Sequence, residues 1–120
     1  TRDFVYVEDV VQACMLALKP QADYNIYNVG CGRPVKILDV AKTISKFYNS
    51  KIEPEIRNKY RKGDIRHCIA DITRIKKELG YKPKVSFKEG IKKLITWAKT
   101  AEAKDFYDQA EKELREKGLV

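Results

Sequence analysis

The chain has 120 residues, of which 43% are hydrophobic and 35% are charged, a size and balance typical of one globular domain with a modest core. The sequence contains neither the long apolar run of a membrane span nor the charged-then-apolar start of a signal peptide, which predicts a cytoplasmic protein without a membrane partner. The three cysteines, Cys14, Cys31 and Cys68, are odd in number and far apart. They fit neither a disulfide framework nor a zinc site, so we expect free thiols and no metal.

The net charge of +8 could attract nucleic acid, an anionic membrane surface or a phosphorylated ligand. Several of the lysines lie beside acidic residues on expected helices, as in the segment 111–113. Such mixed faces are typical of solvent-exposed surface, so we expect no nucleic-acid partner. A small basic nucleic-acid-binding module stays open as an alternative.

The first half of the chain alternates expected strands and helices. Aromatic and β-branched residues at 4–7 predict a strand, and apolar residues at helical spacing predict a helix over 10–18. A second strand is expected over 26–30, ending in the glycine turn Gly30-Cys31-Gly32. A second helix is expected over 37–48.

The second half begins with polar segments. The stretch 52–56 contains Pro54 and reads as a connector or an edge, and the basic stretch 57–66 predicts a loop. Asp71 is an expected N-cap for a short helix that ends at Leu79, before Gly80.

Two further helices are expected towards the end. Ser86 and Glu89 form the S-x-x-E capping box of the first. The second is a charged C-terminal helix over 102–118. No internal repeat, low-complexity segment or linker divides the chain, so residues 1–120 are predicted to be one α/β domain.

Catalytic chemistry has little support in these residues. His67 is the one histidine, and a lone histidine in a basic loop is typically a structural hydrogen-bonding group. The turn at 30–32 is followed by Arg33-Pro34, and proline removes an amide that a dinucleotide-binding loop would need. We therefore expect no catalytic and no cofactor-binding residue in this chain.

Anion binding has better support. Five basic residues surround the pair Gly63-Asp64: Arg57, Lys59, Arg61, Lys62 and Arg66. Arginine forks can hold phosphate oxygens in pairs, and a carboxylate can accept hydrogen bonds from a ribose diol. This composition fits a nucleotide, although an exposed basic loop that binds nothing would look the same.

Four short motifs follow one another along the chain. Segment 2–10 matches R-D-[FY]-[VI]-x-V-x-D-[VL], and segment 27–32 matches Y-N-[VL]-G-x-G. Segment 61–64 matches R-x-G-D, and segment 79–90 matches L-G-[WY]-x-P…E-G. In this order and spacing, they resemble the extended short-chain dehydrogenase/reductases that act on nucleotide sugars. The resemblance extends from Thr1 to about Lys99.

This resemblance implies a small mixed α/β substrate-binding lobe whose Rossmann half is absent. In that family an N-terminal Rossmann domain holds NAD and a Ser/Thr-Tyr-x-x-x-Lys catalytic set, and this sequence contains neither its glycine fingerprint nor Tyr-x-x-x-Lys. NAD is therefore expected on the missing N-terminal domain, which agrees with a chain that opens Thr-Arg-Asp without methionine.

The resemblance also assigns roles to four residues. Arg2 and Arg61 match two arginines that contact the diphosphate, and Asp64 matches the carboxylate on the ribose. Cys68 falls where the sugar pocket of the 4-epimerases is lined, with a small buried residue as the alternative reading.

The expected function is the nucleotide-sugar-binding part of an NAD-dependent 4-epimerase, inactive by itself and homodimeric when complete. Segments 66–68 and 116–120 look like the dTDP-L-rhamnose or UDP-glucose 4-epimerases, so the expected ligand is a UDP- or dTDP-linked sugar. Lys36 departs from the Ser or Thr helix cap of that family. A nucleotide-sugar 4,6-dehydratase is the alternative reaction.

Overall fold

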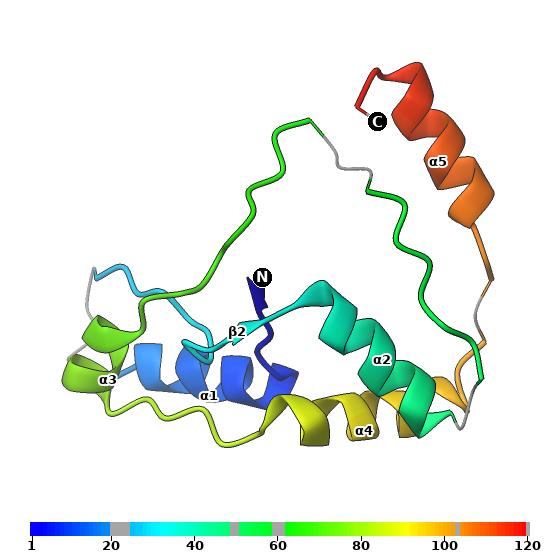
Figure 1. Ribbon diagram of the computed structural model, residues 1–120. Coiled ribbons are helices and arrows are strands. Elements are labelled where there is room, and N and C mark those ends of the chain that lie inside the picture. Colours follow the sequence, from blue (N-terminus) through cyan, green and yellow to red (C-terminus); the bar gives the residue numbers. More distant parts are fainter. Residues whose placement is uncertain (20–24, 49–50, 59–61, 103, 120) are drawn as a thin grey trace.

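A computed structural model describes residues 1–19, 25–48, 51–58, 62–102 and 104–119 of the chain. Within these ranges it contains two short strands and five helices (Figure 1): β1 Arg2–Asp3, α1 Val7–Ala17, β2 Pro34–Val35, α2 Ile37–Phe47, α3 Thr73–Leu79, α4 Phe87–Ala98 and α5 Tyr107–Glu116. The expected mixed α/β fold is confirmed.

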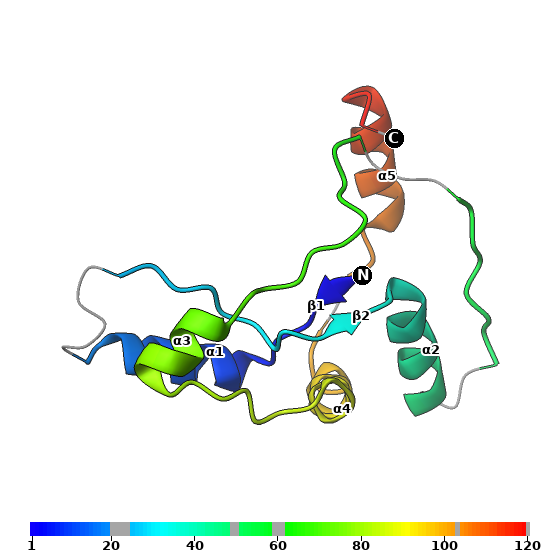
Figure 2. The same cartoon turned by 60° about the vertical axis from the view of Figure 1, so that its left-hand side comes forward.

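The small sheet brings three distant segments together. β1 pairs antiparallel with β2, with Arg2 opposite Val35 and Asp3 opposite Pro34 (Figure 2). On its other side β1 forms a parallel bridge to Cys68, where the Asp3 amide donates to the Cys68 carbonyl at 3.0 Å. This bridge lays the end of the basic loop beside the start of the chain.

The strand expected over 4–7 is wrong, because helix α1 already begins at Val7. The Tyr6 carbonyl accepts hydrogen bonds from the amides of Asp9 and Val10, at 3.0 and 3.2 Å. The aromatic residues that suggested a strand serve packing instead, since the Phe4 and Phe87 rings lie 5.5 Å apart. The helix therefore starts three residues before the expected position.

The strand expected over 26–30 is also not formed, although the segment is drawn out beside α3 (Figure 1). A strand needs a neighbouring strand for its backbone groups, and the described part of the chain provides none here. Two of the backbone carbonyls accept hydrogen bonds from side chains instead. Arg74 donates to the Ile26 carbonyl at 3.2 Å, and Tyr81 donates to the Gly30 carbonyl at 3.0 Å.

The expectations for α2 and α3 are confirmed within two residues at each end, and α4 begins directly after Ser86, as its capping box predicts. Helix α4 carries the complete capping box of Ser86 and Glu89. The Asp71 carboxylate accepts the Thr73 amide at 2.9 Å, although Ile72 is the N-cap residue of α3. Gly80 ends that helix in a left-handed conformation at φ 68°, which glycine adopts without steric cost.

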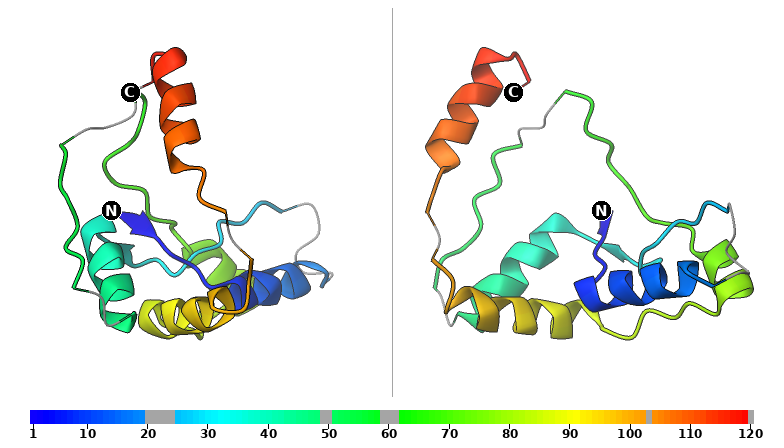
Figure 3. Two further views of the ribbon diagram at one scale, coloured as in Figure 1. Left: turned by 90° about the vertical axis from the view of Figure 1, so that its right-hand side faces the viewer. Right: turned by 180° about the vertical axis from the view of Figure 1, so that it is seen from behind.

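Helix α5 is shorter than the expected 102–118. It begins at Tyr107, where the Asp105 carboxylate accepts the Tyr107 amide at 2.8 Å. All views place α5 away from the other helices, at the end of extended segments (Figures 1–3). One backbone hydrogen bond from Lys62 to Leu119, 3.0 Å long, joins this end to the basic loop.

The core lies where α1 meets α3. Its buried residues are Ala13, Ile72, Ile75, Leu79 and Tyr81. Helix α2 packs on α4 as a second layer. The radius of gyration is 17.5 Å, compared with roughly 14 Å for a compact domain of this length. The chain is therefore an open body with a small core. None of its described helices is both long and apolar enough to cross a membrane.

Candidate substrate-binding site

Arg2 and Asp64, to which the resemblance assigns ligand roles, lie close together. The Arg2 Nη2 atom is 3.9 Å from the Asp64 Oδ1 atom, and the side chains are 33% and 54% exposed. The Arg2 Nη1 atom also donates to the Thr1 carbonyl at 2.9 Å and to the Arg66 carbonyl at 3.5 Å. The guanidinium is thus held by backbone on one side and remains accessible to a ligand.

The sheet explains this proximity. The Cys68 amide donates to the Thr1 carbonyl at 3.1 Å, which fixes the loop 62–67 beside β1. His67 adds a side-chain link, because its Nδ1 atom is 2.8 Å from the Thr1 Oγ1 atom. His67 therefore makes the kind of structural hydrogen bond that the sequence suggested.

The rest of the basic cluster is only partly described. Arg61, the second expected diphosphate ligand, lies outside the described residues, as does Lys59. Arg57 lies 3.0 Å from Glu55, and this hydrogen-bonded partner raises the pKa of the Arg57 guanidinium. Because Arg57 already has a carboxylate partner, it is a weaker anion ligand than the composition suggested.

Cys68 is exposed, so its alternative reading as a small buried core residue is wrong. All three cysteines are free, as expected. Cys31 is the most enclosed of them, and burial together with the nearby charge of Asp3 raises the pKa of its thiol. Among the described residues, no group of three His, Cys, Asp or Glu side chains is placed to hold a metal.

Asp3 connects the first motif to the glycine turn. Its carboxylate accepts the amides of Cys31 at 2.9 Å, of Gly32 at 2.8 Å and of Ala70 at 3.3 Å. A side chain on Gly30 would collide with the Asp3 carboxylate and come within 2.7 Å of the Ala70 Cβ atom. The glycine is thus required for this close approach.

Asp9 and Tyr81 connect the first two motifs to the last. The Asp9 carboxylate is 2% exposed and accepts the amides of Lys84 at 2.8 Å and Val85 at 3.1 Å. Tyr81 is fully buried and donates to the Gly30 carbonyl. Burial, with the charge of Asp9 nearby, raises the pKa of Tyr81 to about 12.

These three roles were missed by sequence reasoning, which treated the motifs as one ligand-binding signature. The sequence offered no clear signal for Asp9, because it follows Glu8 at the start of a helix, where acidic residues are common on the surface. Its burial becomes visible only in the folded chain, where its carboxylate finds the hydrogen-bond donors that a buried charge needs.

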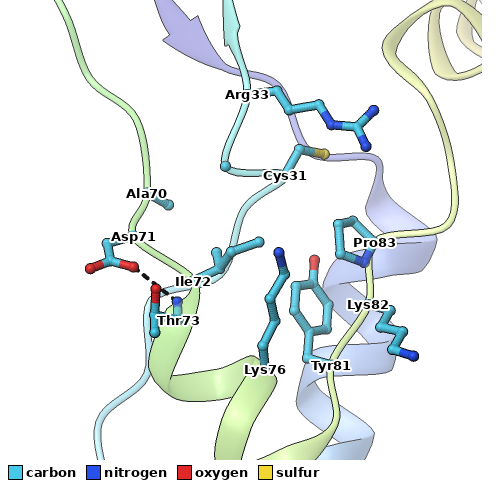
Figure 4. A pocket seen from close by; sticks show the side chains of 11 residues that line it. Cys31, Arg33, Ala70, Asp71, Ile72, Thr73, Lys76, Tyr81, Lys82 and Pro83 are labelled. Carbon is cyan, nitrogen blue, oxygen red and sulfur yellow. Dashed lines mark hydrogen bonds between the residues drawn. The ribbon is translucent and has the colours of Figure 1, made fainter.

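A cavity of about 620 Å³ lies between the glycine turn, the start of α3 and segment 81–83. Figure 4 shows Arg33, Lys76 and Lys82 at this cavity, carried by three different segments. The Asp71 carboxylate there is directed to the Thr73 amide. Neither Arg2 nor Asp64 lines this cavity, so the expected ligand site is separate from it.

Known proteins resemble this chain in both sequence and fold. A family model described as GDP-mannose 4,6 dehydratase matches residues 1–94. The dTDP-L-rhamnose 4-epimerase of Burkholderia thailandensis is 38% identical over 99 residues, covering 81% of this chain and 27% of that protein.

Two solved structures extend the comparison. UDP-glucose 4-epimerase from Thermotoga maritima, with UDP-glucose, aligns with a TM-score of 0.76 at 37% identity and covers 82% of this chain and 31% of that chain. The Bifidobacterium longum UDP-glucose 4-epimerase, in complex with NAD+ and UDP, aligns with a TM-score of 0.69 at 26% identity. This alignment covers 82% of this chain and 30% of that chain.

The fold and the four linked motifs therefore define a part of an extended short-chain dehydrogenase/reductase. The chain belongs to the nucleotide-sugar epimerase and dehydratase family of that class. It spans less than a third of the length of these relatives. Helix α5 lies beyond the residues matched by the family model.

Proposed function

We propose that this chain is the nucleotide-sugar-binding part of an NAD-dependent nucleotide-sugar 4-epimerase. Its task is to hold the nucleotide diphosphate while the sugar is oxidised and re-reduced at carbon 4. The observation that carries the proposal is the pair of Arg2 and Asp64, which lie 3.9 Å apart at the site where the family motifs suggest the ligand.

In this proposal Arg2 and Arg61 bind the diphosphate, and Asp64 accepts hydrogen bonds from the ribose. Guanidinium groups suit phosphate because their donors form paired, charge-assisted bonds. These bonds act far from the reacting carbon, so they can hold the nucleotide while the sugar turns. Cys68, which pairs with Arg2 across the sheet, lines the sugar side, where its small side chain leaves room for a substituent.

NAD is assigned to another part of the full enzyme, because this sequence lacks a glycine-rich phosphate loop. When bound there, NAD supplies the acceptor and later the donor of the hydride. The NAD-binding domain is thus the partner of this chain. A cytoplasmic location and a homodimeric full enzyme remain predictions.

A 4,6-dehydratase is the second candidate, favoured by the description of the family model that matches residues 1–94. Both reactions begin with oxidation of the sugar at carbon 4, and the same diphosphate anchor serves either. A dehydratase needs additional acidic catalytic residues beside the catalytic tyrosine. Their presence or absence in the remainder of the polypeptide separates the two candidates.

Titration of the chain with UDP, dTDP and a DNA duplex at two salt concentrations tests the class of ligand. We expect saturable binding of UDP or dTDP, and only weak DNA binding. A basic nucleic-acid-binding module would instead bind the duplex and lose orders of magnitude in affinity as salt rises, with little response to either nucleotide.

We also expect no turnover of a nucleotide sugar by the isolated chain with NAD. Detectable turnover would contradict the assignment of NAD binding and catalysis to another part of the full enzyme.

A further inference from the structure

Three basic residues line the cavity beside the glycine turn, and each comes from a different segment. Arg33 follows the turn and precedes β2, Lys76 lies on α3, and Lys82 follows that helix. Figure 4 shows the Lys76 side chain extended towards the turn, with Cys31 and Arg33 beyond its ammonium group, whereas Lys82 is directed outwards. The fold thus gathers three positive charges that lie far apart in the sequence.

These three cations have no carboxylate partner within the described part of the chain. Nearby cations do have one, since Arg74 of α3 lies 3.2 Å from Glu78 and Lys93 of α4 lies 3.0 Å from Glu8. Positive charges that are gathered without a partner repel one another, and an anion between them relieves the repulsion. The rim of the cavity therefore attracts negative charge from solution.

Asp71 is the one carboxylate among the described residues that line the cavity. It accepts the Thr73 amide at 2.9 Å, and the hydrogen bonds from Thr73 lower the pKa of the Asp71 carboxyl. Asp71 is therefore charged at neutral pH, but it is one negative charge against three positive ones. Burial raises the pKa of the Cys31 thiol, so Cys31 adds no negative charge at neutral pH.

The walls of the cavity are fixed by contacts that need no ligand. The Asp3 carboxylate accepts the amides of Cys31 at 2.9 Å and Gly32 at 2.8 Å, which sets the course of the glycine turn. Ile72 and Tyr81 line the cavity from the buried core. The backbone that carries the cations is thus already in place, which lowers the entropic cost of binding an anion.

We infer that this cavity is a second anion-binding site, which takes a small molecule that carries phosphate. The Arg33 guanidinium can donate a pair of hydrogen bonds to phosphate oxygens, and the Lys76 ammonium adds a compact charge. Lys82 adds attraction from the rim. The site is separate from Arg2 and Asp64, neither of which lines the cavity. The inference therefore goes beyond the proposed function and does not depend on it.

The size and the surroundings of the cavity favour a small molecule over nucleic acid. Its volume of about 620 Å³ lies within the range of about 300–1,000 Å³ that is usual for small-ligand sites. A nucleic-acid surface needs basic residues that follow many phosphates along the backbone. Next to the cavity, α3 instead carries the ion pair of Arg74 with Glu78, so the unpaired positive charge is local.

Calorimetric titration with inorganic pyrophosphate tests the inference in the full polypeptide that carries this chain. UDP is present in excess, so that the proposed diphosphate anchor is filled. We expect one further saturable binding event. The absence of pyrophosphate binding overturns the inference, and so does pyrophosphate that binds only by displacing UDP. If UDP itself does not bind, the diphosphate anchor is refuted, and the variants below still decide whether the cavity binds pyrophosphate.

Lys76→Gln and Lys77→Gln give a matched comparison. Both variants remove one positive charge from an exposed position of α3, but only Lys76 lines the cavity. We expect Lys76→Gln and Arg33→Gln each to weaken pyrophosphate binding at least about tenfold, as the loss of a charge-assisted bond implies, and Lys77→Gln to weaken it less than about twofold. Equal weakening in the two lysine variants overturns the inference, because the anion is then held by overall charge. Thermal unfolding reports whether each variant is folded.

Two further probes identify the source of the phosphate. Glucose 6-phosphate that binds more tightly than inorganic phosphate supports a phosphorylated metabolite as the ligand, whereas the reverse order supports the free anion at the same site. A DNA duplex that displaces pyrophosphate with a steep salt dependence overturns the assignment to a small molecule.

Discussion

At the scale of single residues, the positions in the four motifs divide into two chemical groups. Arg2 and Asp64 face the proposed ligand, whereas Asp3, Asp9 and Tyr81 accept or donate hydrogen bonds between segments. The ligand roles of the first group come from the resemblance to the nucleotide-sugar family and stay predictions. The second group could not be predicted, because its partners are backbone groups far away in the chain.

Asp3→Asn tests the structural group. An amide can accept only at its oxygen, so the variant loses at least one of the three backbone hydrogen bonds and the charge that strengthens them. We expect the free energy of unfolding to fall by about 1–3 kcal/mol, measured by denaturant titration. Asp39→Asn, at an exposed position in the first turn of α2, is the matched control and should cost less than about 1 kcal/mol.

Ionisation of the buried Tyr81 should make the folded chain less stable in alkali. The pKa of Tyr81 is raised to about 12 in the folded chain, above the ordinary tyrosine value of 10.0. The stabilisation that the neutral phenol gives the fold is therefore complete below pH 10 and disappears as the pH rises towards 12. Two pKa units correspond to about 2–3 kcal/mol. Tyr81→Phe should lack this loss in denaturant titrations between pH 10 and 12, after costing about 1 kcal/mol at neutral pH for the hydrogen bond to Gly30. Equal pH dependence in both proteins would contradict this role.

At the scale of elements, local sequence signals predicted the helices but not the strands. Helix α4 was predicted from Ser86 and Glu89, and α3 from Asp71 and Gly80, because a cap needs only residues within one turn. A strand depends on its neighbour, so the patterns at 4–7 and 26–30 could not reveal that no described segment pairs with them. The observed pairing of β1 with β2 and Cys68 was not readable from either pattern.

Ser86→Ala tests the local control of α4. The Ser86 hydroxyl accepts the Glu89 amide at 3.3 Å, and its own hydrogen bond to the Glu89 carboxylate lowers the pKa of that carboxyl. We expect the free energy of unfolding of the variant to be about 0.5–2 kcal/mol lower than that of the wild type. Lys88→Ala, an exposed position in the same helix, should stay within about 0.5 kcal/mol of the wild type. A Ser86→Ala protein as stable as the control would show that the box contributes nothing.

The pH dependence of α4 follows from the same contact. The pKa of Glu89 is lowered, so its contribution is complete above the ordinary glutamate value and disappears as the pH falls through the lowered pKa. Ser86→Ala removes the main cause of this shift. The wild type should therefore lose its advantage over the variant in acid, as measured by thermal unfolding from neutral pH downwards.

At the scale of the whole molecule, the chain is open in shape, with a small core and a helix α5 that lies apart from the other helices. The sequence predicted the lobe and its family through the order of four motifs. It could not predict how the motifs meet, since the carboxylate and tyrosine contacts that join them arise only in the folded chain.

The diphosphate anchor is tested most directly by calorimetric titration of the complete enzyme with UDP and UMP, in the wild type and in Arg61→Ala. A charge-assisted bond is worth about 1.5–3 kcal/mol, so we predict that the variant binds UDP about 10- to 150-fold more weakly. The preference of the wild type for UDP over UMP should shrink in the variant by a similar factor. An unchanged dissociation constant for UDP in Arg61→Ala would contradict the account.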